Sequence, residues 1–299
     1  MTATDTVVRH SWSAMGNTAH LVVTGIDESD AARVVDAAVG RVEELEAAWS
    51  RFRVDSEISR FNRTGRIDEL GEDSRSMLAH MDAARLATRG AYDARILPHI
   101  LDLGYTYSLV DGRHASASLH GNAVDPGGIG KGLAADIVVT EMMNMVMMNR
   151  GADGVLVSIG GDMRCIGRGD HHTTDNADRW VIDIERPGNR DESIARIAVR
   201  DGGVATSNVS AKRWTGLAAH ESHVIDPRTS GSLNPAAREI VQATVIASTG
   251  AWADAFATAC LVHDPATALG LLDDNGLAGL LVTADGRVIA SSNWRSFAC

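Results

Sequence analysis

The sequence predicts an α+β fold with mixed or antiparallel sheets, packed helices and two closely packed lobes. Some segments of the 299-residue chain alternate apolar and polar residues, as half-buried strands do, and others repeat apolar residues at helical spacing. The two kinds of segment do not follow one another in strict strand–helix–strand order. That order is typical of a doubly wound parallel sheet, so we favour α+β.

The first half of the chain predicts a pair of strands followed by helices. Residues 7–26 alternate around Met15-Gly16-Asn17 and predict paired strands. Apolar residues at helical spacing predict a helix over 29–48, with Ser29 or Asp30 as a suitable N-cap. Further helices are expected at 56–62 and 73–89. The irregular segment 92–122 is expected to wrap around a site.

The second half predicts more strands than helices. A helix is expected to begin near Gly130 and to end near Asn149. After it we expect strands at 154–159, 180–185, 194–200 and 240–247, helices at 249–262 and 265–273, and a closing hairpin near 278–290. We expect residues 1–299 to form a single domain.

Composition excludes several classes of protein. The net charge of −11 argues against nucleic acid as the main partner, because binding to phosphate backbones needs a basic surface. Three widely spaced cysteines fit free thiols in a reducing compartment. No apolar run reaches about 18 residues, so stable membrane insertion is not expected. The first residues lack the pattern of a secretory signal. We therefore expect a cytoplasmic protein.

A glycine-dense loop from Asp125 to Asp136 holds Lys131, one of only two lysines in the chain. Backbone N–H groups before a helix attract anions, and a lysine adds a mobile positive charge. The glycine spacing matches neither a P-loop nor the dinucleotide-binding fingerprint. The loop therefore predicts an anionic ligand, unless it is only a tight turn between a strand and a helix.

Two further segments could approach a ligand closely. Gly160 and Gly161 follow a predicted strand, and Asp162 could accept hydrogen bonds from a ribose hydroxyl or an adenine amine, although a plain hairpin is equally consistent. The segment Ala205-Thr206-Ser207-Asn208 places short hydroxyl side chains after two glycines. It could equally be an ordinary turn.

Two other segments carry titratable groups. His223 and Asp226 lie three residues apart, so His223 could move protons near neutral pH, or the two could form a buried structural pair. Asp254 and Thr258 lie four residues apart in a predicted helix and therefore share one face. A carboxylate and a hydroxyl suit Mg²⁺ better than zinc. In the alternative reading both side chains only satisfy local backbone groups.

Taken in order, these segments resemble the ApbE family, whose members are FAD:protein FMN transferases. The resemblance covers nearly the whole chain, and its motifs are listed here in order: Met15-Gly16-Asn17, Ser50-Arg51-Phe52, Asp55–Asn62, Tyr92-Asp93, Leu103-Gly104-Tyr105, Asp125–Asp136, Gly160-Gly161-Asp162, Ala205-Thr206-Ser207, His223–Thr229 and Ala253–Thr258.

The resemblance implies roles for individual residues. The positions expected to contact FAD are Met15, Phe52, Asp102, Leu103, Gly104, Asp125, Lys131, Asp162, Thr206, Ser207 and Ile225. The Gly128 carbonyl, Asp254 and Thr258 are expected to hold Mg²⁺. Asp254, His223 and Lys131 are the expected catalytic residues.

The implied reaction transfers FMN from FAD to a Thr or Ser hydroxyl of an acceptor protein and releases AMP. Two rivals stay open: a pyrophosphatase that splits FAD into FMN and AMP with water, and an FAD-binding protein without turnover. The chain departs from the family pattern at Asn17, Asn208 and Ser230, where Thr-containing or Gly-containing motifs are usual. These departures bear on acceptor choice and rate more than on FAD binding.

Overall fold

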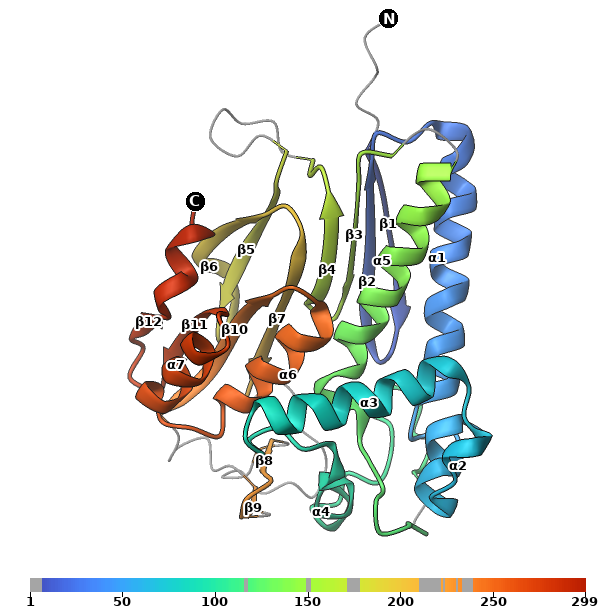
Figure 1. Cartoon of the computed structure of the whole chain (residues 1–299), viewed down its shortest axis with the longest axis vertical. Helices are drawn as coiled ribbons and strands as arrows, with labels where there is room; N and C mark the ends of the chain where they lie inside the picture. Colours follow the sequence, from blue (N-terminus) through green and yellow to red (C-terminus); the bar gives the residue numbers. More distant parts are fainter. Residues whose placement is uncertain are drawn as a thin grey trace, which may run out of the picture.

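The computed structural model describes residues 7–115, 118–148, 152–170, 178–209, 222, 224–229, 231–232 and 239–299. Its centre is an eight-stranded sheet with the strand order β1-β2-β3-β4-β7-β10-β11-β12 (Figure 1). Every pair of neighbouring strands in this sheet is antiparallel. The strands are β1 (Val7–Ala14), β2 (Asn17–Thr24), β3 (Gly154–Ile159), β4 (Asp162–Gly167), β7 (Gly202–Asn208), β10 (Ile240–Ala247), β11 (Ala278–Thr283) and β12 (Val288–Ala290).

Helices cover one face of the sheet, with α5 against β3 and β4 and α6 against β7 and β10 (Figure 1). The long helix α1 packs on α5, and α3 crosses below α6. The helices are α1 (Glu28–Trp49), α2 (Glu57–Thr64), α3 (Glu72–Ala87), α4 (Leu97–Asp102), α5 (Gly130–Met148), α6 (Gly250–Cys260) and α7 (Pro265–Asp274). Two small hairpins lie outside the main sheet: β5 (Trp180–Arg186) with β6 (Asn189–Val199), and β8 (Ile225–Asp226) with β9 (Gly231–Ser232).

Alternation along the strands divides the hydrophobic core between the two faces of the sheet. In β7, Ala205 belongs to the main cluster under the helices, whereas Val204 belongs to a second cluster. Leu281 and Leu280 alternate in the same way in β11. The second cluster includes Trp180, so the β5–β6 hairpin covers part of the face opposite the helices. Because successive side chains of a strand point to opposite faces, one sheet serves both cores.

The start of α6 is wedged between α5 and β7 at glycines. A Cβ placed on Gly132 of α5 would lie 2.2 Å from the carbonyl oxygen of Gly250. A Cβ on Gly203 of β7 would lie 2.2 Å from the backbone nitrogen of the same residue. Thr249 caps the helix, and its side chain accepts a hydrogen bond from the Trp252 N–H. Only glycine allows the three backbones to approach this closely.

The α+β prediction is confirmed, and most predicted elements occur with ends shifted by one or two residues. The segment 205–208, for which an ordinary turn was one alternative, forms part of β7. This segment pairs antiparallel with β10, and Thr206 lies opposite Thr244. The two preceding glycines are typical of turns, but here Gly203 makes room for the start of α6. The prediction of a single domain over 1–299 stays a prediction.

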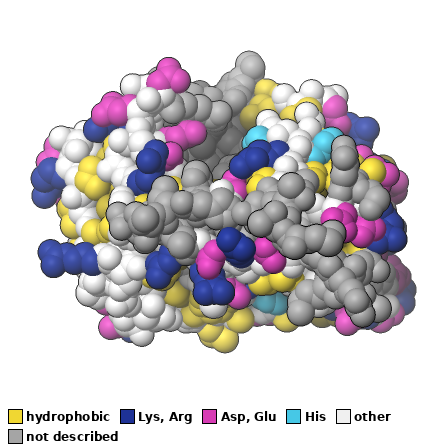
Figure 2. Space-filling view, turned by 90° about the horizontal axis from the view of Figure 1, so that it is seen from above, with side chains coloured by type: hydrophobic (Ala, Val, Ile, Leu, Met, Phe, Trp, Pro, Cys, Tyr) yellow, Lys and Arg dark blue, Asp and Glu magenta, His cyan; other side chains and the backbone are white. Residues whose placement is uncertain are grey.

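The helices and the surface charges concern two of the predictions about partners. None of the helices in the described ranges is long and apolar enough to cross a membrane. On the face seen in Figure 2, acidic and basic side chains are interspersed. The absence of nucleic-acid binding stays a prediction from the net charge of −11.

We expect Gly132→Ala to lower the free energy of unfolding by about 3 kcal/mol, because its methyl group must displace backbone atoms of α6. Gly270→Ala is the matched control. It lies in α7 with nothing within 4 Å of the added Cβ, and should stabilise the protein by about 0.5–1 kcal/mol through helix propensity. Urea unfolding of both variants measures the difference. Equal effects would contradict the proposed wedge.

Candidate active site

A small cavity of about 260 Å³ lies where the start of α5, the start of β4, the end of β7 and the middle of α6 meet. It brings together many of the residues that the sequence predicts for a site. Those that line it are Asp125, Gly128, Lys131, Asp162, Thr206, Ser207, Ile225, Asp254 and Thr258. They come from segments far apart in the chain, so the cavity depends on the complete fold.

Lys131 lies between two buried carboxylates in this cavity. Its ammonium group forms an ion pair with Asp162, and the Asp254 Oδ2 lies 3.8 Å from the Lys131 Nζ. Both aspartate side chains are only 3% exposed. Burial disfavours the charged lysine, but the charges of Asp162 and Asp254 outweigh it and raise the pKa of Lys131. The lysine is therefore a fixed cation. Asp162, expected to bind a ribose or adenine, has this lysine as its partner.

The oxygen atoms of Asp254 and Thr258 lie one helical turn apart on the face of α6 that lines the cavity. The Thr258 Oγ1 lies 3.1 Å from the Ser207 Oγ of β7. A Cβ on Gly128 would lie 3.1 Å from the same Thr258 oxygen, so the glycine loop packs directly against this hydroxyl. A carboxylate, a hydroxyl and a peptide group thus meet in one small volume. That donor set fits a hard cation such as Mg²⁺.

The described residues hold no group of three or more His, Cys, Asp or Glu side chains arranged for a metal. A cation at Asp254 would therefore draw its other ligands from hydroxyl and backbone oxygens, from the bound substrate, or from water.

Asp136 of α5 fixes the start of α6. Its Oδ1 accepts a hydrogen bond from the Gly250 N–H at 2.7 Å, and its Oδ2 accepts one from the Ala251 N–H at 2.9 Å. Burial raises the pKa of Asp136 to about 6, although these two N–H groups and Arg164 act in the opposite direction. A side chain of α5 thereby sets the position of the helix that carries Asp254.

Asp125 is held by Arg51, a residue to which the sequence assigned no role. The Arg51 Nε lies 2.6 Å from the Asp125 Oδ2, and the arginine side chain is 5% exposed. The guanidinium carbon lies 4.1 Å from the ring centre of Phe52 and 4.5 Å from that of Tyr105. The Asp125 Oδ1 accepts a hydrogen bond from the Gly127 N–H at 2.6 Å. Arg51 therefore fixes the first residue of the glycine loop. Nothing local in the sequence distinguishes it from a surface arginine.

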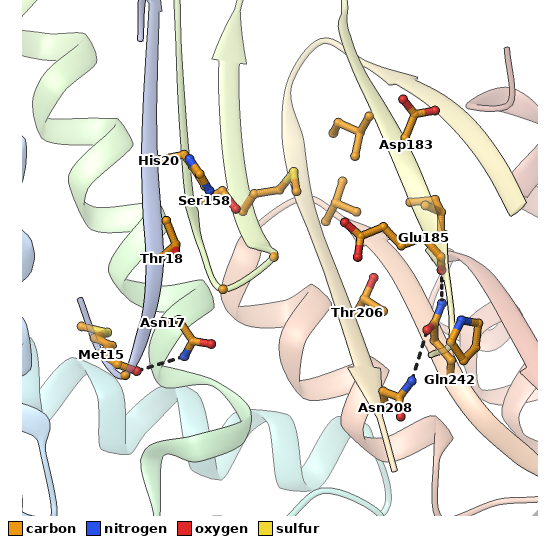
Figure 3. A pocket seen from close by; sticks show the side chains of 18 of the residues that line it. Met15, Asn17, Thr18, His20, Ser158, Asp183, Glu185, Thr206, Asn208 and Gln242 are labelled. Atoms are coloured by element: carbon orange, nitrogen blue, oxygen red, sulfur yellow. Dashed lines mark hydrogen bonds between the residues drawn. The ribbon is translucent and has the colours of Figure 1, made fainter. Parts of the chain in front are cut away.

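A larger groove of about 1450 Å³ adjoins the small cavity on the face of the sheet opposite the helices (Figure 3). The two share Asn17, Gly160, Thr206 and Asn208. Figure 3 shows Asn17 on one side of the groove and Asn208 on the other. Asn17 donates a hydrogen bond to the Met15 carbonyl at 3.0 Å, and Asn208 donates one to the Gln242 Oε1 at 3.3 Å. A long ligand could extend from the cavity into this groove.

Other predicted site residues lie elsewhere. Met15 lines the groove but not the small cavity. Phe52 packs beside Arg51 and Tyr105 and lines neither. Asp102, Leu103 and Gly104, at the end of α4, line neither as well. His223 and Ser230 lie outside the described residues.

Tyr92 was not predicted as a site residue, yet it lines the small cavity. The side chain is almost completely buried, and its hydroxyl has no hydrogen-bond partner within the part of the chain that the structure describes. Burial, and then the negative charges of Asp254 and Asp125, raise the pKa of this hydroxyl. It is therefore a neutral donor. Sequence reasoning missed this residue because a tyrosine and a phenylalanine count equally as apolar residues in a hydrophobic pattern.

Comparisons with known proteins show the family to which the chain belongs. The model of the ApbE family matches residues 15–281. The chain belongs to the ApbE family. This confirms the family predicted from the ordered motifs.

Two relatives within the ApbE family are named FAD:protein FMN transferase. The protein from Vibrio cholerae is 25% identical over 288 residues, covering 86% of this chain and 82% of the relative. The protein from Haemophilus influenzae is 26% identical over 326 residues, covering 96% and 90%. These names support the prediction of an enzyme.

Solved structures of the ApbE family share the fold. The flavin transferase ApbE from Vibrio cholerae has a TM-score of 0.75 at 23% identity, over 98% of this chain and 100% of that one. The ApbE protein from Thermotoga maritima has a TM-score of 0.81 at 22% identity, with the same coverage. At these identities the structures support the fold rather than individual residues.

We expect Lys131→Met to lower the free energy of unfolding at pH 7 by about 3 kcal/mol, because two buried carboxylates lose their shared cation. The double variant Lys131→Met/Asp162→Asn should recover much of this loss. Arg89→Met, which breaks an exposed ion pair with Asp274, serves as the control and should have no measurable effect. Urea unfolding of all four proteins tests the coupling. A double variant as unstable as the single one would contradict it.

Asp136 should make stability depend on pH. A carboxyl whose pKa rises from 3.8 to about 6 on folding stabilises the protein below about pH 4. That contribution disappears as the pH rises through about 6, and its size is roughly 2–3 kcal/mol.

The asparagine in the Asp136→Asn variant cannot titrate. The unfolding free energy of the wild type should therefore fall relative to that of the variant between pH 4 and pH 7. Urea unfolding at each pH measures it. Parallel pH curves would contradict the raised pKa.

Proposed function

We propose that this protein is a Mg²⁺-dependent FAD:protein FMN transferase that moves FMN from FAD to a Thr or Ser hydroxyl of an acceptor protein. One observation carries the proposal. Asp254 and Thr258 share the cavity-facing side of α6, against the glycine loop and beside the fixed cation of Lys131. The relatives named FAD:protein FMN transferase give this arrangement its expected substrate.

FAD would occupy both the small cavity and the groove. Ligand pockets usually measure about 300–1,000 Å³, so the cavity of about 260 Å³ holds only part of a dinucleotide. We propose that the pyrophosphate lies near Lys131 and that the rest of FAD extends past Asn17 and Asn208. Of the predicted FAD contacts, Met15 lines the groove and Asp125 lines the small cavity.

The residues that would hold Mg²⁺ are Asp254, Thr258 and the Gly128 carbonyl. Bound there, the ion would neutralise charge that develops on the pyrophosphate. Ser207 keeps the Thr258 hydroxyl in place from the neighbouring strand. Asp136 keeps the whole helix in place from its first residues.

In the proposed reaction the acceptor oxygen forms a bond to the FMN-side phosphorus as the pyrophosphate P–O bond breaks. The bonding electrons leave with AMP, and the acceptor hydroxyl gives up its proton. Lys131 faces the negative charge that gathers on the phosphates, and it is prevented from moving by Asp162. Asp254 and His223 are the candidates for receiving the proton, and a metal-bound carboxylate is the weaker base.

The cytoplasmic location stays a prediction.

We predict that Asp254→Ala abolishes Mg²⁺-dependent turnover of FAD. The assay combines FAD, Mg²⁺ and candidate acceptor proteins, and follows AMP release and in-gel flavin fluorescence. Asp36→Ala, which removes an exposed carboxylate of α1, is the matched control and should keep full activity. EDTA should inhibit the wild type and Asp36→Ala alike. Normal turnover by Asp254→Ala would refute the metal assignment.

The same assay separates the rival functions. AMP release without covalent flavin on any acceptor would favour a pyrophosphatase. FAD binding without AMP release would favour a binding protein. In either case Lys131→Met should weaken FAD binding or turnover. The assay should be run under conditions in which urea unfolding shows that the variant is still folded.

A further inference from the structure

The buried hydroxyl of Tyr92 lowers the stability of the folded protein, and the fold alone does not explain why it is there. The residue is 3% exposed, and no group in the described ranges accepts or donates a hydrogen bond to its oxygen. A buried polar group without a partner destabilises a protein, and native structures contain few of them. Phenylalanine would fill the same space without that cost. The hydroxyl therefore suggests a partner that arrives with a ligand.

The hydroxyl is held close to the glycine loop. The Tyr92 N–H donates a hydrogen bond to the Thr88 Oγ1 at 3.0 Å, which fixes its backbone. A Cβ on Gly128 would lie 3.1 Å from the ring carbon Cε2 of Tyr92, so ring and loop are in direct contact. Tyr92 and Lys131 both line the small cavity. The ring is thus in contact with the glycine loop, and the residue forms part of the wall of the small cavity.

The chemistry of a tyrosine hydroxyl decides its role. An ordinary tyrosine has a pKa of about 10, so the group is protonated near neutral pH. The group keeps an O–H to donate, and an anionic oxygen is its best acceptor. In the proposed function, the anion that enters this cavity is the pyrophosphate of FAD.

We propose that the Tyr92 hydroxyl donates a hydrogen bond to a pyrophosphate oxygen of bound FAD, and that it is a binding residue of this site. The inference rests on the proposed function and adds a specific contact to it. Lys131 would then contribute charge, and Tyr92 a directed neutral donor, to the same group of the substrate.

Tyr92→Phe in the full-length protein with Mg²⁺ tests the inference. We expect the dissociation constant for FAD to rise at least about tenfold, as for the loss of a hydrogen bond to a charged acceptor. The inhibition constant of inorganic pyrophosphate, used as a competitor, should rise by a similar factor. The unfolding midpoint of the ligand-free variant should equal or exceed that of the wild type, because the buried hydroxyl is gone.

Tyr107→Phe is the matched control, since this half-buried tyrosine packs against His114 and lines neither cavity. It should leave all three quantities unchanged. An unchanged FAD constant in Tyr92→Phe would overturn the inference, as would a lower unfolding midpoint, which would indicate a structural role. Weaker FAD binding with unchanged pyrophosphate inhibition would also overturn it.

The proposed function can fail separately. A wild-type protein that binds no FAD defeats both proposals. A wild type that transfers FMN while Tyr92→Phe binds FAD equally well defeats only the inference about Tyr92.

Discussion

The candidate site depends on how the first residues of α6 fit between α5 and β7. Gly250 meets Gly132 on one side and Gly203 on the other at backbone contact distance. Asp136 holds the same helix end through two hydrogen bonds. One turn later along α6 comes Asp254, and the next turn brings Thr258. The positions of Lys131 on α5 and Ser207 on β7 relative to these oxygens follow from this one junction.

The sequence predicted the parts of the fold that have a clear period, and not the contacts between distant segments. The spacing of Asp254 and Thr258 was enough to place both on one helix face. Strand β7 was not predicted, because Gly202 and Gly203 are turn residues in isolation and Gly203 packs against the start of α6, far along the chain. The pairing of Lys131 with Asp162 joins segments without any local signal. Arg51 belongs to one of the family motifs, but its ion pair with Asp125 likewise has no local signal.

The charges of the cavity explain why a cation would be needed. Lys131 faces two carboxylates, so this group alone carries a net negative charge. Arg51 and Asp125 neutralise each other nearby. A pyrophosphate would meet a site that is already rich in negative charge, and electrostatic repulsion in a buried site is strong. In the proposed function, the oxygen donors of α6 and the glycine loop would hold a compensating metal ion.

The strand order also bears on how the protein folds. Ala19 of β2 pairs with Ile159 of β3, 140 residues later, whereas most other neighbours in the sheet are closer in the chain. Closing so long a loop costs on the order of 4 kcal/mol of chain entropy. We therefore expect the β1–β2 hairpin to dock late in folding. Since Asn17 on this hairpin borders both cavities, a newly made chain would gain its ligand site only in its final folding step.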